Sequence, residues 1–97
     1  MIYIYVIASS PEGPCKIGYS NDPFKRLKKL QTGHPERLSV HHCIPFAPAH
    51  APLVERKIHE TVRHLRMSGE WFRLTVEDAI AEVNFALIRY GEDGSSD

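Results

Sequence analysis

The chain has 97 residues, enough for one domain with a single modest hydrophobic core. Hydrophobic residues make up 42% of the sequence and charged residues 25%, the balance of an ordinary globular protein. The formal net charge of +0 argues against tight, non-specific DNA binding by the whole surface, and no apolar run approaches the roughly 18 residues of a membrane-spanning helix.

The start of the chain predicts a β-hairpin. Residues 1–8, MIYIYVIA, are rich in β-branched and aromatic side chains, which favour a strand. Residues 9–14, SSPEGP, have the composition of a turn. Residues 15–20, CKIGYS, then predict a second strand that pairs with the first.

A helix and a third strand follow the hairpin. Asp22 can cap the helix, the proline after it suits the first helical position, and Gly33 marks the end of the helix. Its apolar face consists of Phe24, Leu27 and Leu30. Residues 37–46 alternate in polarity and predict the third strand.

The second half of the chain predicts two helices. The first runs from about 49 to 66, and 69–74 form a short extended link. Thr75 begins the last helix, while the small acidic segment 91–97 is expected to be a flexible tail. We therefore expect residues 1–90 to form a single α+β domain. Its small three-stranded antiparallel sheet is flanked by helices, in the order β-β-α-β-α-α.

Lys16 is unusual because it stands in a strand that otherwise looks buried. The hairpin allows Tyr3 or Tyr5 to lie across from it, and Arg26 follows early on the next helix. Phenol, ammonium and guanidinium groups together suit a phosphate. Glu55 lies on the second predicted helix, and a carboxylate beside a phosphate site is a candidate ligand for Mg²⁺.

A set of short motifs resembles a nuclease superfamily. The set is YIY at 3–5, KIG at 16–18, Arg26 within DPFKRLKKLQTG, Glu55 within LVERKIHETV, and GEWF at 69–72. Together these motifs resemble the GIY-YIG nuclease superfamily over about residues 2–74. The resemblance is closest to its small single-domain branch of the meiotically-up-regulated-gene type, in which KIG stands where YIG is usual.

The resemblance implies a metal-dependent endonuclease that hydrolyses DNA phosphodiester bonds with one divalent metal ion, Mg²⁺ or Mn²⁺. By position, Tyr5 matches the phenol that assists the attacking water, and Lys16 and Gly18 match the second triplet. Arg26 matches the arginine that neutralises the scissile phosphate, and Glu55 matches the metal ligand. An ammonium from Lys16 near Tyr5 would favour its phenolate form.

Other residues are assigned supporting or DNA-contacting roles. They are Tyr3, Gly18, His34, His59, Glu70 and Lys29. Leu30 stands where many members of the superfamily have a histidine, for which His34 or His42 could substitute. Glu70 could help to bind the metal or orient a water molecule, and His59 follows Glu55 by one helical turn.

Two other interpretations stay open. One is a catalytically inactive DNA-binding module of the same fold, in which Glu55 turns away or Tyr3 fills the cleft. The other is a protein-interaction or dimerisation domain, with an exposed apolar patch. That patch would be formed by Phe24, Phe46, Phe85 or Ile88.

The size and the opening segment suggest partners and a location. A nuclease domain this small has little surface with which to read a DNA sequence, so a homodimer or a partner protein would supply specificity. The opening MIYIYVIAS lacks the basic region and the long apolar segment of a signal peptide. We therefore expect a cytoplasmic protein that binds DNA and no membrane.

Overall fold

The computed structural model describes residues 1–90 and confirms the α+β fold class. The tail predicted over 91–97 lies outside the described residues. The elements in chain order are β1 (Ile2–Ala8), β2 (Cys15–Ser20), α1 (Pro23–Gln31), β3 (Ser39–Phe46), α2 (Ala51–Thr61), the 3-10 turn η1 (Arg63–Leu65), β4 (Arg66–Ser68), β5 (Trp71–Phe72) and α3 (Val76–Tyr90). No helix within residues 1–90 is long and apolar enough to cross a bilayer.

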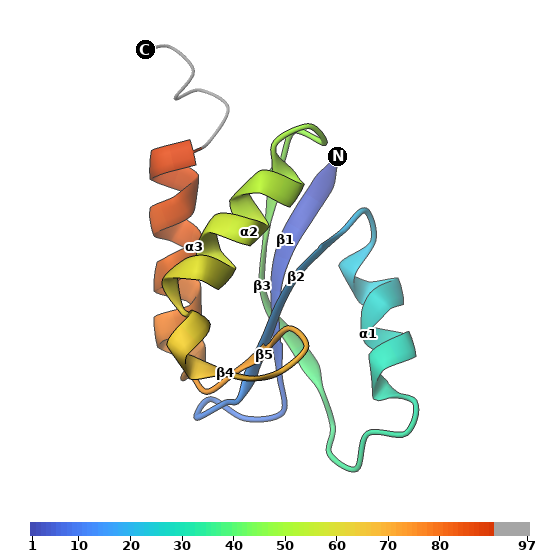
Figure 1. The fold of residues 1–97 in the computed structure, drawn as a ribbon. Coiled ribbons are helices and arrows are strands. Elements are labelled where there is room, and N and C mark those ends of the chain that lie inside the picture. Colours follow the sequence, from blue (N-terminus) through green and yellow to red (C-terminus); the bar gives the residue numbers. More distant parts are fainter. Residues whose placement is uncertain (91–97) are drawn as a thin grey trace.

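The sheet has five antiparallel strands in the order β3-β1-β2-β5-β4, two more than the sequence predicted. Figure 1 shows α1 on one side of this sheet, with α2 and α3 together on the other. In the central hairpin, Tyr5 pairs with Gly18, and Ile7 pairs with Lys16. Directly paired residues project to the same side of a sheet, so these four share the face that α1 covers.

The predicted second helix is too long at its C-terminal end. The helix α2 ends at Thr61, and Arg66 belongs to β4 instead. The apolar residues Val62 and Leu65 continue the helical spacing, but here Val62 precedes a tight 3-10 turn and Leu65 ends it. The predicted link over 69–74 contains β5, which pairs with β2 and so extends the sheet.

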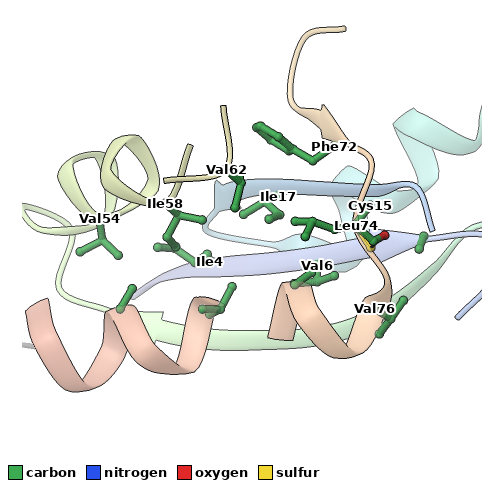
Figure 2. Packing of buried hydrophobic residues seen from close by; sticks show 14 of the residues in the cluster. Ile4, Val6, Cys15, Ile17, Val54, Ile58, Val62, Phe72, Leu74 and Val76 are labelled. Carbon is green, nitrogen blue, oxygen red and sulfur yellow. Dashed lines mark hydrogen bonds between the residues drawn. The ribbon is translucent and has the colours of Figure 1, made fainter. Parts of the chain in front are cut away.

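Two hydrophobic clusters fill the two sides of the sheet. The larger lies beneath α2 and α3, where Figure 2 shows Ile4 of β1 next to Ile58 of α2, and Val6 nearer Leu74 and Val76. The smaller lies beneath α1 and contains Tyr5, Ile7 and Leu38. Because both faces are covered, β1 is buried almost continuously along its length. Tyr5 is only 1% exposed, which fixes its ring at the centre of the sheet.

Candidate functional site

The free edge of β2 brings α2 and the β4–β5 turn together. The strand β5 pairs with β2 only at Cys15 and Lys16. One residue further on, the Ile17 amide donates to the Glu70 carbonyl at 3.2 Å. The Ile17 carbonyl accepts a hydrogen bond from Nε2 of the buried His59 at 2.8 Å. A carbonyl only accepts, so His59 carries a proton on Nε2. These two bonds hold Glu70 and α2 against the second half of β2.

Gly18 lies at the centre of the site. A Cβ atom placed on Gly18 would lie 2.5 Å from the Tyr5 hydroxyl and 2.8 Å from Oε1 of Glu70. Contacts this short are not tolerated, so the phenol and the carboxylate occupy the space that a side chain at Gly18 would fill. The glycine therefore allows a tyrosine of β1 to meet an acid from the β4–β5 turn.

Glu70 is the partner of Lys16. The Lys16 ammonium lies 3.5 Å from Oε1 of Glu70 and 5.7 Å from the centre of the Trp71 ring. The expectation that Tyr3 or Tyr5 lies directly across from Lys16 is wrong, because the register places Ile7 there. A lysine is accommodated in this strand because a carboxylate and an aromatic ring flank its head group.

The surroundings of Tyr5 keep its hydroxyl protonated at neutral pH. Burial, with smaller contributions from the charges of Glu70 and Glu55, raises the pKa of Tyr5 to about 12. The charge of Arg26 and its hydrogen bond with the phenol lower the pKa, but by less. The expectation that Lys16 favours the phenolate is therefore not met, because burial dominates and the ammonium is paired with Glu70.

Glu55 and Glu70 form a close pair of carboxylates. Burial, the charge of Glu70 and a hydrogen bond with Glu70 together raise the pKa of Glu55 to about 7, with burial the largest cause. Lys16 and Arg66 act in the opposite direction. A hydrogen bond between two carboxyl groups requires a proton on one of them, and the raised pKa places this shared proton on Glu55 below about pH 7.

The donor set of this pair fits Mg²⁺ or Mn²⁺. These cations bind through one or two carboxylates, with substrate phosphate oxygens and water completing the coordination. Within residues 1–90, no group of three or more His, Cys, Asp and Glu side chains is arranged to hold a metal ion. The Glu55–Glu70 pair therefore suits an open, oxygen-rich site, in which a cation would take the place of the shared proton.

The family of the chain follows from comparison with known domains. The family model of the T5orf172 domain matches residues 2–87. The chain belongs to the T5orf172 domain family. No curated protein and no solved structure gives a significant match.

This finding overturns the predicted membership of the GIY-YIG superfamily. The T5orf172 domain is related to GIY-YIG-like and HNH-like domains but is a distinct family, and no GIY-YIG model matches. Tyr3, Lys16 and Leu30 are positions at which the sequence departs from the GIY-YIG pattern. The T5orf172 domain is a nuclease-like family, so a DNA-related activity agrees with this assignment at a coarse level.

The two histidines considered for this T5orf172 domain lie in different places. His34 stacks on Trp71 with a centroid distance of 5.8 Å, so it lies near the same ring as the Lys16 ammonium. Nε2 of His42 lies 3.0 Å from the side-chain oxygen of Asn84 on α3. His42 pairs with Val6, on the opposite face of the sheet from Tyr5, and so cannot take the place of a histidine in the site.

The remaining predicted residues flank the centre. Tyr3 pairs with Ser20, one pleat beyond Tyr5 on the same face of the sheet. Lys29 lies with Lys25 and Arg26 in a groove of about 230 Å³ at the start of α1. Of these residues, Arg26 is the one that hydrogen-bonds with the Tyr5 phenol.

Arg66 is a site residue that sequence reasoning missed. Its charge lowers the pKa of Glu55, and its guanidinium lies 5.5 Å from the centre of the Phe72 ring. The sequence predicted that Arg66 ends the second helix, so its side chain was not expected near Glu55. The sequence feature that could have indicated the turn between β4 and β5 is Gly69, whose φ is 57° in the structure.

The geometry bears on the two alternative interpretations. The Glu55 carboxyl meets Glu70 rather than turning away, so one of the two arrangements expected for an inactive binding module is not present. Of the four residues named for an apolar patch, Phe46 is only 1% exposed. The exposed Phe24 lies on α1, while Phe85 and Ile88 lie on α3 across the sheet, so they form no single surface (Figure 1).

Proposed function

We propose that this T5orf172 domain is a metal-dependent endonuclease that hydrolyses phosphodiester bonds in DNA. The observation that carries the proposal is the convergence of a phenol, two carboxylates and two cations around Gly18. Those side chains come from five separate segments of the fold, and they are Tyr5, Lys16, Arg26, Glu55 and Glu70.

A purely structural role explains this cluster poorly. An ion pair between Lys16 and Glu70 alone would stabilise the fold modestly. Adding Glu55 beside Glu70 brings two like charges together in a partly buried place, which raises the pKa of Glu55 and costs stability. Strongly shifted groups of this kind concentrate at functional sites, where the chemistry requires them.

Each of these residues has a separate role in phosphodiester hydrolysis. The guanidinium of Arg26 binds two oxygens of the scissile phosphate and stabilises the negative charge that grows there, and Lys16 adds a second cation. The Tyr5 hydroxyl orients the attacking water by accepting a hydrogen bond from it. The water oxygen then forms a new bond to phosphorus as the bond from phosphorus to the leaving 3′ oxygen breaks. The water passes one proton to the Tyr5 phenolate, and the 3′ oxygen takes up a proton from solvent.

Glu55 and Glu70 would hold the divalent cation, which would supply electrostatic stabilisation of the charge on the phosphoryl and leaving oxygens. Releasing the shared proton gives the pair the two charges that such a cation requires. The same carboxylates raise the pKa of Tyr5, so neutralising them brings that pKa down. A larger fraction of Tyr5 would then be phenolate, the form that can accept the proton of the attacking water.

The test is cleavage of supercoiled plasmid and branched DNA in Mn²⁺, Mg²⁺ or EDTA, comparing wild type with Glu55→Ala. We expect metal-dependent nicking by the wild type and none by the variant. Equal cleavage by both preparations would mean that the activity is a contaminant or that the site is elsewhere. DNA retardation without cleavage by the wild type would favour the binding module instead.

A further inference from the structure

A second, larger groove borders the carboxylate pair on the α2 side of the sheet. Its volume is about 520 Å³, and Glu55 forms part of its wall. We call it the arginine groove, because Arg56, Arg63 and Arg66 line it together with Tyr19. A volume in this range matches pockets that hold small organic molecules, so it has room for one nucleotide.

The arginines of this groove are arranged for phosphate contacts. They come from α2, η1 and β4, and all three side chains are exposed. Glu60 on the rim and Glu55 in the wall are the acids that face them. Three cations thus outnumber two carboxylates, one of which is already paired with Glu70. Exposed cations that gather in a groove attract a polyanion through proximity alone.

The arginine groove and the smaller groove at α1 are lined by consecutive residues at the end of β2. Tyr19 lines the first groove and Ser20 lines the second, which also contains Lys25 and Arg26. Neighbouring strand residues point to opposite faces, so the two grooves open on either side of the same strand edge. A polynucleotide that passes from one groove to the other crosses this edge between Arg26 and Glu55.

Tyr19 adds an exposed aromatic ring to the arginine groove, which phosphate binding alone does not require. Its side chain is 38% exposed, and it shares the groove wall with the exposed Pro52. An exposed aromatic ring beside arginines is the arrangement with which proteins stack an unpaired base while binding its backbone. A base inside a continuous duplex is already stacked on its neighbours and cannot reach such a ring.

We propose that the arginine groove holds an unpaired nucleotide next to the scissile phosphate, with its base stacked on Tyr19. The substrate class would then be DNA that is single-stranded at the point of cleavage, such as a flap or a fork, rather than continuous duplex. This inference rests on the proposed function, because it takes the scissile phosphate to lie at Arg26 and Glu55.

Binding is tested first, in EDTA, so that the readout does not depend on cleavage. A fluorescein-labelled 12-nucleotide strand and its duplex are titrated with wild type, Tyr19→Ala, Tyr19→Phe, Arg63→Ala and Arg89→Ala. We expect the wild type to prefer the single strand. Tyr19→Ala should weaken that binding by about 5- to 100-fold, while Tyr19→Phe retains it, because stacking uses the ring and not the hydroxyl.

The arginine variants provide a matched pair. Arg63→Ala should weaken binding and reduce the slope of log affinity against log salt by about 0.7. Arg89→Ala removes an exposed arginine of α3, outside the groove, and should leave affinity unchanged. Thermal denaturation of each variant establishes that the exposed substitutions leave the fold intact. Equal affinity of wild type and Tyr19→Ala for the single strand would overturn the inference.

A cleavage assay then distinguishes a failure of this inference from a failure of the proposed function. With Mn²⁺, we expect the wild type to cut a flapped duplex at the junction at least tenfold faster than a continuous duplex of the same sequence. Equal rates on both, unchanged by Tyr19→Ala, would overturn the inference and leave the nuclease intact. Tight binding through Tyr19 without any cleavage would overturn the proposed function, and with it the placement of the nucleotide beside a scissile phosphate.

Discussion

Gly18→Ala is the substitution that most directly disturbs the centre of the site. Its new Cβ atom would lie 2.5 Å from the Tyr5 hydroxyl oxygen and 2.8 Å from both Cζ of Tyr5 and Oε1 of Glu70. The shortest of these contacts is about 1 Å closer than ordinary van der Waals contact. The Tyr5 ring is 1% exposed and packed beneath α1, so it has nowhere to move without disturbing Ile7 and Leu38.

Two opposing effects decide the size of the change in stability. Alanine restricts the unfolded chain and suits a strand better than glycine, which favours the variant by about 0.5–1 kcal/mol. Forcing an extra methyl group into a packed place typically costs about 1–3 kcal/mol. The steric term is larger, so we expect a net destabilisation of about 1–2 kcal/mol. In a domain of this size that lowers the melting temperature by roughly 4–16 °C.

Gly18→Ala should also lower the cleavage rate, by more than the loss of folded protein alone would explain. Moving the phenol or the Glu70 carboxylate by about 1 Å can cost about 100-fold in rate. Thermal denaturation and single-turnover cleavage, at a temperature where the variant remains folded, measure the two effects separately. Gly33→Ala is the control, because its φ of 81° strains an alanine while no atom lies within 4 Å of the new Cβ. It should lose stability but keep its cleavage rate.

A double variant tests the contact itself. Tyr5→Phe removes the hydroxyl responsible for the shortest contact, so Gly18→Ala should be less destabilising in that background by at least about 0.5 kcal/mol. If Gly18→Ala is as stable and as active as the wild type, the phenol does not pack over Gly18. The arrangement of the site described here would then be wrong.

Three further predictions concern the groups around this centre. The pKa of Glu55, about 7 when folded and near 4.5 when unfolded, means that its contribution to stability is complete below about pH 4.5 and lost as pH rises through 7. Glu55→Gln should therefore have a free energy of unfolding about 1 kcal/mol higher than wild type at pH 8, after solvent screening, and so a higher melting temperature. At pH 4 it should show no such gain. His59→Leu leaves the Ile17 carbonyl without its donor and should lower the unfolding free energy by about 1–3 kcal/mol in urea denaturation, whereas an unchanged midpoint would contradict the 2.8 Å bond. Arg26→Lys keeps the charge but loses the planar fork, so single-turnover cleavage should fall at least tenfold while DNA affinity in EDTA stays within about twofold; a cleavage rate equal to wild type would remove Arg26 from its proposed role.

Local signals in the sequence predicted the main framework of the fold. The β-branched run of β1 and the turn after it specify the hairpin, and Asp22 caps α1 as expected by accepting from the Lys25 amide. The β4–β5 hairpin was missed because its strands have only three and two residues, too few to show any alternation. Pairing with β2, far away in the sequence, defines it.

The site was less predictable than the fold. The residue types at Tyr5, Lys16, Arg26 and Glu55 pointed to phosphate and metal chemistry, and the structure brings their side chains together. The superfamily inferred from them was wrong, since T5orf172 is a distinct family. The direction of the Tyr5 pKa shift was also wrong, because the depth of burial and the pairing of Lys16 with Glu70 depend on the folded chain.

The measurement that tests the central claim most directly is single-turnover cleavage of a labelled flapped DNA in Mn²⁺ by Glu55→Gln, Glu12→Gln and wild type, purified in parallel. Glu12 is an exposed acid in the loop between β1 and β2, so its variant controls for the loss of one charge. We predict that Glu12→Gln cleaves at the wild-type rate. The cleavage rate of Glu55→Gln should be at least 100-fold lower, although the variant remains folded. Equal rates for all three proteins would contradict a metal-dependent site at Glu55.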